Sequence, residues 1–447
     1  MDHPRTLDEA KQFLLERLRI HRSPMAFVES SRAEAVIRDL TSLDGETWGS
    51  AWGEVGAAYE RDARTHHDRG DSAAAAKAHF QAYAFCSVGR YPCPNHPRKL
   101  ANYVKARENF VLAGAHFEPP LSRLVLPFAG RPDEGKDVVI YVRRPADVAR
   151  PKVVVLWGGI DGWKEETKEN ADSFLELGLA VVSVDMPGVG ESPVVGSVDA
   201  ERQFTPVFEW IQAQPDLDGQ RVACMGTSFG GYWAGKVAHT HRACIAAAVS
   251  WGGCAHYTFQ SEWFTTRRYP DSYLMDLIET RARTLGGSTY DDYAARIGRL
   301  SLLDQGILEQ PHAPLLLVNG KDDQQSTIQD LYLLLEHAGP KDGRVYPGGI
   351  WAARTTRSRQ LFAGSASGWR LPNSNRFGGQ RSKAAKGRLR GRSRSSARSK
   401  KRTSLTRTAP ASTPTANLPS SSRSADPPSI ARLNATGAER QPDSTRP

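Results

Sequence analysis

The sequence has few cysteines and lacks the cysteine spacings that are typical of disulfide frameworks or zinc sites. Among 447 residues there are five cysteines, an odd number, and no Cys-x-x-Cys pair. This pattern argues against a disulfide framework and a structural zinc site, and it favours a reducing compartment. The sequence also lacks an apolar run long enough to span a bilayer, and its N-terminus lacks the apolar segment of a signal peptide. We expect a cytoplasmic protein with no membrane partner, metal or cofactor.

Acidic residues are scarce at the C-terminal end. The chain has 59 Lys+Arg and 49 Asp+Glu, of which residues 350–447 hold 21 and 3. This segment therefore carries a net charge of +18, whereas residues 1–349 carry −8. It is rich in Arg, Ser, Pro and Ala without apolar periodicity, which is typical of disorder. We expect a disordered basic tail over residues 350–447 that binds nucleic acid non-specifically at most.

The first 120 residues have helical patterns. Apolar side chains recur there at three- and four-residue spacing, as on one face of a helix; they are Trp48, Trp52, Val55, Tyr59 and Ala63. A second helical stretch begins at Ser72. A tetratricopeptide pair would need about three copies to be stable, and no fixed period occurs. We therefore predict a helical N-terminal cap over residues 1–120.

From residue 121 apolar runs alternate with helical stretches. The first two runs predict a strand pair, and five later ones read "PKVVVLWGG", "LAVVSVDMPG", "RVACMGTS", "CIAAAVSWGG" and "APLLLVNG"; "GRVYPGG" predicts the last strand. Nearly continuous apolar strands with helical crossovers are typical of a parallel sheet covered on both faces. We predict an α/β fold with a mostly parallel, doubly wound sheet over residues 121–349.

Residues 226–230 form a Gly-x-Ser-x-Gly motif, Gly-Thr-Ser-Phe-Gly, between a predicted strand and a predicted helix. In that context the motif is the nucleophile elbow of α/β-hydrolases. The tight turn raises the Ser228 hydroxyl above the sheet and directs the backbone N–H of Phe229 at the reacting oxygen. We predict Ser228 as the nucleophile and Phe229 as one oxyanion donor; the alternative is a glycine-rich turn without a catalytic role.

The turn "LWGGIDGWKEE" follows the third predicted strand, where α/β-hydrolases place the second oxyanion donor. The backbone N–H of Gly159 or of Ile160 is the predicted donor. The alternative is an ordinary turn in which Asp161 caps the next helix. Asp185, in "DMPGVGES" after the fourth strand, is predicted to be structural.

The triad acid belongs after a late strand, between serine and histidine in chain order. In "LLLVNGKDDQQ" Asp323 fits this position, with Asp322 as its rival; a solvated turn pair is the non-catalytic alternative.

The sequence lacks a suitable general base. Only His337 follows Asp323, and we predict a solvated histidine at a helix end. Three histidines soon after the serine are predicted at the surface or in the pocket: His239, His241 and His256. A serine without a base is a weak nucleophile.

Taken together, these motifs resemble α/β-hydrolases of the fermentation/respiration switch esterase type. That group also includes a pseudooxynicotine carbon–carbon hydrolase and fungal polyketide-shortening hydrolases. The matching segments are "TWGSAWGEVGAAYE", "GGIDGWKEE", "DMPGVGES", "GTSFGG" and "VNGKDD", within residues 30–349. The resemblance implies cleavage of an ester or carbon–carbon bond in a small apolar acyl compound. It also implies that the helical cap and the insertion after residue 255 line the pocket. Four aromatic residues of the insertion either line the pocket or pack in the core, namely Tyr257, Phe259, Trp263 and Phe264.

The chain departs from the resembled family directly after Gly349. The family continues its paired glycines with His-Met-Gly-Arg, and that histidine is the triad base, whereas this chain continues with Ile-Trp-Ala-Ala-Arg. One reading of the gene explains the difference. His-Met-Gly-Arg-Thr encoded CAT ATG GGC CGC ACG becomes ATA TGG GCC GCA CG when its first C is dropped, which reads Ile-Trp-Ala-Ala-Arg. We predict a frameshift between Gly349 and Ile350, with a genuine disordered extension as the alternative.

Three functions follow as hypotheses. The first is a serine hydrolase with a small-molecule substrate that uses Ser228 and Asp323. The second is a catalytically impaired or binding-only α/β-hydrolase, because the triad histidine is missing. The third is nucleic-acid binding through the tail, which we consider the weakest. A homodimer is compatible with the sequence.

Overall fold

The structure is a computed structural model that describes residues 3–337, 339 and 341–350. The predicted disorder of the tail and the predicted frameshift fall on residues 351–447, apart from their first position. They therefore lie outside the described residues and stay predictions.

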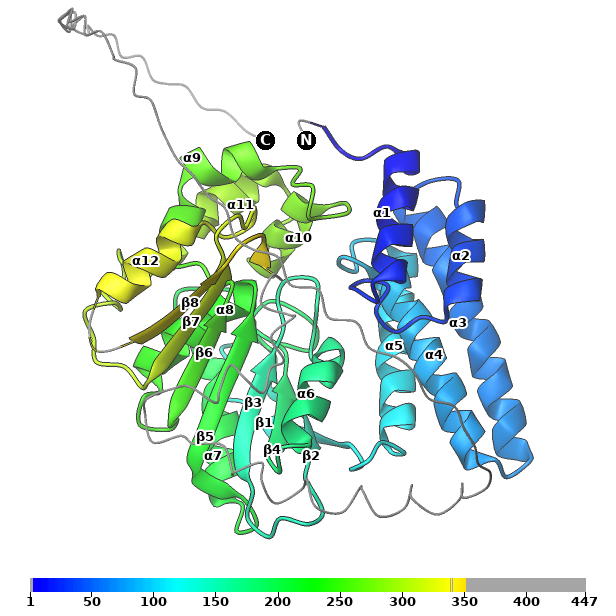
Figure 1. The fold of residues 1–447 in the computed structure, drawn as a ribbon, viewed down its shortest axis with the longest axis horizontal. Coiled ribbons are helices and arrows are strands. Elements are labelled where there is room, and N and C mark those ends of the chain that lie inside the picture. The colour runs from blue at the N-terminus through cyan, green and yellow to red at the C-terminus, as the bar shows by residue number, and fades with distance from the viewer. Residues whose placement is uncertain (1–2, 338, 340, 351–447) are drawn as a thin grey trace, which may run out of the picture. The chain divides into compact units, whose positions relative to one another are not determined.

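The N-terminal part consists of five helices, coloured blue to cyan in Figure 1. They are α1 (Leu7–Arg19), α2 (Ser30–Asp39), α3 (Gly45–Asp68), α4 (Ser72–Arg90) and α5 (Pro97–Gly114). Polar side chains cap the starts of these helices; Thr6 forms a capping box with Glu9, and the Asp44 carboxylate accepts two backbone N–H bonds of α3. Trp48 and Trp52, expected on one face of a helix, are fully buried against α4.

An eight-stranded sheet follows, in the order β1-β2-β4-β3-β5-β6-β7-β8. Its strands are β1 (Ser122–Pro127), β2 (Asp137–Arg143), β3 (Lys152–Trp157), β4 (Ala180–Val184), β5 (Asp218–Thr227), β6 (Ala247–Trp251), β7 (Leu315–Gly320) and β8 (Lys341–Tyr346). The pairs β1–β2 and β2–β4 are antiparallel and the others parallel. The predicted mostly parallel sheet is therefore confirmed.

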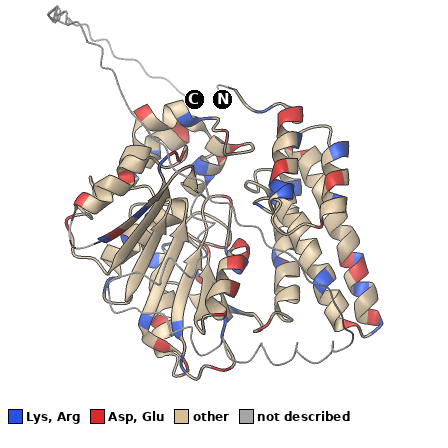
Figure 2. Ribbon diagram, in the orientation of Figure 1, with Lys and Arg blue, Asp and Glu red and all other residues tan. Residues whose placement is uncertain are grey.

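Helices connect the parallel strands and cover the sheet (Figure 1). The crossover helices are α6 (Lys168–Leu175), α7 (Thr205–Ala213), α8 (Phe229–Thr240) and α12 (Ile328–Glu336). Figure 2 shows the strands largely free of charged residues, which gather on helices and loops. The central strands β3, β4 and β6 are almost wholly buried, as the apolar runs predict.

The segment between β6 and β7 carries short helices instead of one crossover. They include α9 (Ser261–Phe264), α10 (Leu277–Thr284) and α11 (Tyr290–Ile297). Lys99 of α5 pairs with Asp276 just before α10, at 3.1 Å, so the N-terminal helices contact this insertion. Among the described residues, no helix combines the length and the apolar character needed to cross a membrane.

Candidate active site

The elbow places Ser228 between β5 and α8 in a strained conformation. Ser228 has φ 56° and ψ −129°, a region that costs a non-glycine residue conformational energy and that clusters at functional sites. Its backbone N–H donates to the Trp251 carbonyl at 2.8 Å, and its carbonyl accepts from Gly231 at 2.7 Å. The surrounding chain therefore holds the serine in this conformation.

The two motif glycines are required by close backbone contacts. A Cβ at Gly226 would lie 2.0 Å from the Gly230 carbonyl oxygen, and a Cβ at Gly230 would lie 2.0 Å from the Gly158 oxygen. No side chain fits at these distances, so the sequence spacing follows from the tight turn. Phe229 begins α8, where first-turn N–H groups have no partner within the helix and favour negative charge.

The predicted second oxyanion segment lies directly against the serine. A Cβ at Gly159 would lie 2.9 Å from the Cβ of Ser228 and 3.3 Å from its Oγ. Gly159 and Ile160 both lie beside the serine, so both backbone N–H groups stay predicted donors.

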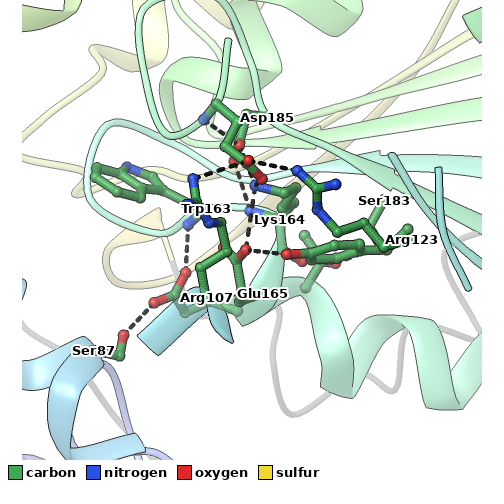
Figure 3. A network of polar contacts seen from close by, with 12 residues as sticks. Ser87, Arg107, Arg123, Trp163, Lys164, Glu165, Ser183 and Asp185 are labelled. Atoms are coloured by element: carbon green, nitrogen blue, oxygen red, sulfur yellow. Dashed lines mark hydrogen bonds and ion pairs between the residues drawn. The ribbon is translucent and has the colours of Figure 1, made fainter. Parts of the chain in front are cut away.

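A buried lysine anchors the chain that follows this segment (Figure 3). Lys164 Nζ lies 2.7 Å from Asp185 Oδ2 and 3.2 Å from Glu165 Oε1, and the backbone N–H of Lys164 donates to Asp185 Oδ1 at 2.9 Å. Burial opposes the charge on Lys164, but Asp185 and Glu165 outweigh it and raise its pKa. These contacts favour the structural role predicted for Asp185.

Glu191 completes this cluster from the other side. Its carboxylate lies 2.9 Å from Lys164 Nζ and accepts hydrogen bonds from Arg107 at 2.9 Å and Arg123 at 3.0 Å. The lysine cluster, defined as these three cations with Glu165, Asp185 and Glu191, therefore has three charges of each sign. It ties α5, β1 and the end of β4 to the oxyanion segment.

The two aspartates after β7 differ in their surroundings. Asp322 is exposed and accepts a hydrogen bond from the Gly348 N–H at 2.9 Å. Asp323 is 6% exposed, its Oδ1 accepts from the Gln325 N–H at 2.9 Å, and its Oδ2 has no partner among the described residues. Burial raises the pKa of Asp323 to about 6, although hydrogen bonds oppose the shift.

The histidines do not supply a partner for this carboxylate in the described structure. His337 ends α12 and lies 2.7 Å from Glu309, as expected for a helix-end residue. His256 lies 2.7 Å from the Ser301 hydroxyl. The prediction of a surface or pocket position for His239 is wrong: it is 3% exposed and bonds the Gln310 carbonyl, and burial lowers its pKa to about 4.

Ile350 follows Gly349, at the position where the sequence analysis expects the histidine of the resembled family. Its carbonyl accepts a hydrogen bond from the indole of Trp251 at 2.9 Å, and it is 4% exposed. It lines the same cavity as Ser228.

Two neighbouring cavities share Ser228 and Gln325; the smaller one is called the inner pocket and the larger one the outer pocket. The inner pocket, of about 30 Å³, is lined by Ile160, Ser228, Phe229, Cys254, Thr258, Phe259, Arg281, Thr284, Leu285, Tyr293, Ile297, Gln325 and Ser326. The outer pocket, of about 120 Å³, extends from Ser228 and Gly159 to Ile350 and to the N-terminal helical part, including Phe13 and Arg17. No histidine of the described chain lines either pocket.

The aromatic residues of the insertion do not share one role. Of the four, Phe259 lines the inner pocket, whereas Phe264 packs against Tyr290 and Tyr293. The sequence analysis did not single out Arg281 of α10, which also lines this pocket. The segment "ETRARTLGG" contains two arginines and a helical pattern, but spacing alone does not tell which one is buried.

Other reactive groups near Ser228 are poorly suited to catalysis. Cys254 lines the inner pocket, but burial raises the pKa of its thiol well above the usual range, so the nucleophilic thiolate is disfavoured. Within the described residues, no three His, Cys, Asp or Glu side chains are grouped to hold a metal ion.

Known proteins share this architecture. The 2,6-dihydroxy-pseudo-oxynicotine hydrolase structure has a TM-score of 0.64 at 20% identity, covering 78% of this chain and 95% of that one. The AbyA5 wild-type structure has a TM-score of 0.61 at 18% identity, covering 80% and 92%. At these identities the likeness shows the fold, which is the predicted α/β-hydrolase fold.

Sequence relatives carry hydrolase names. The chain is 25% identical over 281 residues to esterase FrsA of Photobacterium profundum, covering 62% of this chain and 65% of the relative. It is 27% identical over 214 residues to 2,6-dihydropseudooxynicotine hydrolase of Paenarthrobacter nicotinovorans, covering 46% and 55%. The chain thus spans less than two thirds of the length of these relatives. The family described as "Esterase FrsA-like" matches residues 20–346, most of the chain, so the protein belongs to the FrsA-like esterase family of α/β-hydrolases.

Proposed function

We propose that the protein is a serine hydrolase whose nucleophile is Ser228. The observation that carries the proposal is the strained Ser228 at the start of α8, with Gly159 packed against its side chain. The Ser228 oxygen attacks the acyl carbon, and the oxyanion accepts bonds from the N–H of Phe229 and of Gly159 or Ile160. The ester C–O bond breaks, the alcohol leaves with the serine's proton, and water then hydrolyses the acyl-enzyme.

The proposed acid is Asp323 rather than Asp322. Asp323 is buried in the loop whose next residues, Gln325 and Ser326, line the pocket that contains Ser228. Its free Oδ2 suits a triad acid, which holds a histidine by one oxygen. Asp322 instead binds the chain near Gly348.

A second function is favoured by a specific observation. Ile350 lies in the outer pocket where the resembled family has a histidine, and no described histidine lines the pockets. A general base contributes about 10²–10⁴-fold to such reactions, so this chain would be a slow enzyme or a binding-only protein. Both versions retain a small apolar acyl compound as the ligand, with ester or carbon–carbon cleavage as the ancestral reaction.

A fluorophosphonate probe distinguishes the serine hydrolase from the binding-only protein. Its phosphorus bonds to the serine oxygen as fluoride leaves and the hydroxyl proton goes to solvent. Slow labelling of the full chain that is lost in Ser228→Ala supports the hydrolase. Ser288→Ala, which changes an exposed serine that lines neither pocket, is the control and should label normally. If the wild type is not labelled, the binding-only function replaces the hydrolase.

A further inference from the structure

Arg281 is a buried cation that forms no close ion pair with a carboxylate of the described residues. Its side chain is 9% exposed, and its Nη1 is buried without a hydrogen-bond partner among the described residues. Leaving a buried charged donor unpaired is costly, so such a group usually has a ligand or a functional role.

The other deeply buried arginines of the described chain show what normal pairing looks like. Arg90, 2% exposed, lies 2.7 Å from Glu166, and Arg143, 5% exposed, pairs with Asp172. Each of these arginines joins two segments of the fold. No carboxylate of the described residues lies within ion-pair distance of Arg281. Asp323 attracts it only over a longer distance, and neither Nη1 of Arg281 nor Oδ2 of Asp323 has a hydrogen-bond partner there.

The surroundings of Arg281 favour an anion. Among the described residues that line the inner pocket, Arg281 is the single charged side chain. Its neighbours there are apolar groups such as Phe259 and Leu285, and hydroxyl groups such as Thr258 and Thr284. A charge interaction is stronger in such surroundings than in water. A guanidinium matches a carboxylate through two parallel N–H bonds, which adds direction to the attraction.

The size of the pocket limits the group that enters it. About 30 Å³ holds about two water-sized groups, which suits the two oxygens of a carboxylate and not an aromatic ring. Ser228 lines the same pocket, so a compound whose carbonyl reaches Ser228 can place a second group near Arg281.

We propose that Arg281 binds a carboxylate on the substrate, so that the preferred substrates carry one anionic acid group on the otherwise apolar acyl compound proposed above. The inference rests on the proposed function for the placement of the reacting carbonyl at Ser228. It does not rest on turnover by this chain. Arg281 contacts the substrate away from the reacting atoms and therefore acts in specificity.

The test is a binding measurement on the full chain. Calorimetry compares 3-phenylpropionate with 3-phenylpropanamide, which has nearly the same shape and no charge. The wild type should bind the acid at least tenfold more tightly. Arg281→Met should reduce the preference to about one, and Arg281→Lys, which keeps the charge without the planar fork, should retain part of it.

Arg283→Met is the matched control. Arg283 lies on the same helix, is 39% exposed and pairs with Glu279 at 3.1 Å, so its loss should leave the preference unchanged. Circular dichroism checks that each variant is folded, and if Arg281→Met is unfolded the comparison of wild type with Arg281→Lys decides.

The inference is overturned if the wild type shows no preference for the acid over the amide, or binds neither probe. It is also overturned if folded Arg281→Met keeps the preference of the wild type. If Arg281→Met weakens the binding of both probes equally, Arg281 supports Asp323 and does not bind the carboxylate. Failure of the fluorophosphonate reaction with a retained preference removes the proposed hydrolase and leaves the carboxylate site in place.

Discussion

Two buried charged regions of this protein are built in opposite ways. In the lysine cluster three cations and three carboxylates lie in contact (Figure 3), and the cluster ties the oxyanion segment to neighbouring elements. Around the inner pocket, Nη1 of Arg281 and Oδ2 of Asp323 have no hydrogen-bond partner within the described chain. Paired buried charges fix a structure, whereas unpaired ones are held ready for a ligand or a reaction.

The largest expected effect is a rise in the rate of ester hydrolysis when the reading frame is restored, because Asp323 then regains a histidine partner together with the segment that follows it. Restoring one C before codon 350 should recreate Gly-Gly-His-Met-Gly-Arg and replace the basic tail. Since removal of a triad histidine costs up to about 10⁶-fold in rate, the restored chain should gain up to that factor. Hydrolysis of p-nitrophenyl acetate measures it. A restored frame without a histidine at position 350, or without a rise in rate, contradicts the frameshift.

A smaller rise in the rate of ester hydrolysis is expected when only the histidine side chain is introduced, by Ile350→His. Ile350→His places a histidine in the cavity that contains Ser228, and a positioned general base contributes about 10²–10⁴-fold. The gain should be below that of the restored frame, because the residues after the histidine stay unchanged. The same ester assay applies, with Ile350→Gln as the control that is polar but not basic. An equal rate in both variants would show that position 350 does not reach Ser228.

Breaking the paired region should affect stability rather than specificity. Lys164→Met leaves Asp185 and Glu165 buried without their shared cation, which costs about 3–5 kcal/mol in the free energy of unfolding. Lys105→Met is the control, because Lys105 is 52% exposed, lies 3.5 Å from Glu60, and such pairs contribute at most about 1 kcal/mol. Urea unfolding measures both. Similar losses in the two variants would contradict the distinction between the regions.

The lysine cluster and the pocket also differ in how much of each can be predicted from the sequence. The strands and the elbow were predictable, because continuous apolar runs and a tight turn leave direct traces in residue type and spacing. The lysine cluster was not, since its members come from α5, β1, the segment after β3 and the end of β4. "GWKEE" alone has the composition of an exposed turn.

The pocket was predictable only where a motif marks it. Gly-x-Ser-x-Gly and the Gly-x-x-Asp after β7 pointed to Ser228 and Asp323, and the geometry supports both as proposals. Arg281 was missed because its burial depends on how α10 packs, and His239 was misplaced because α8 is buried along most of its length. Residues that a tight turn requires can therefore be predicted from the local sequence, whereas the burial of a side chain by distant segments cannot.

The smallest expected effect is on the free energy of unfolding, which the buried carboxylate of Asp323 lowers when it is ionised. The folded-state pKa of Asp323 is about 6, above its ordinary value of 3.8, so the folded protein binds this proton more tightly than the unfolded chain. Stability therefore falls as pH rises from about 4 to 6, and at pH 8 the ionised carboxylate costs about 1.5–3 kcal/mol. Asp323→Asn removes the charge and should unfold at higher urea concentration than the wild type at pH 8, with the difference vanishing near pH 4. Asp322→Asn, at an exposed position, should show no such pH dependence. If Asp322→Asn reproduces the effect, or if Asp323→Asn is less stable at pH 8, the unpaired and costly acid is not Asp323, and its free Oδ2 would not mark the place of a triad histidine.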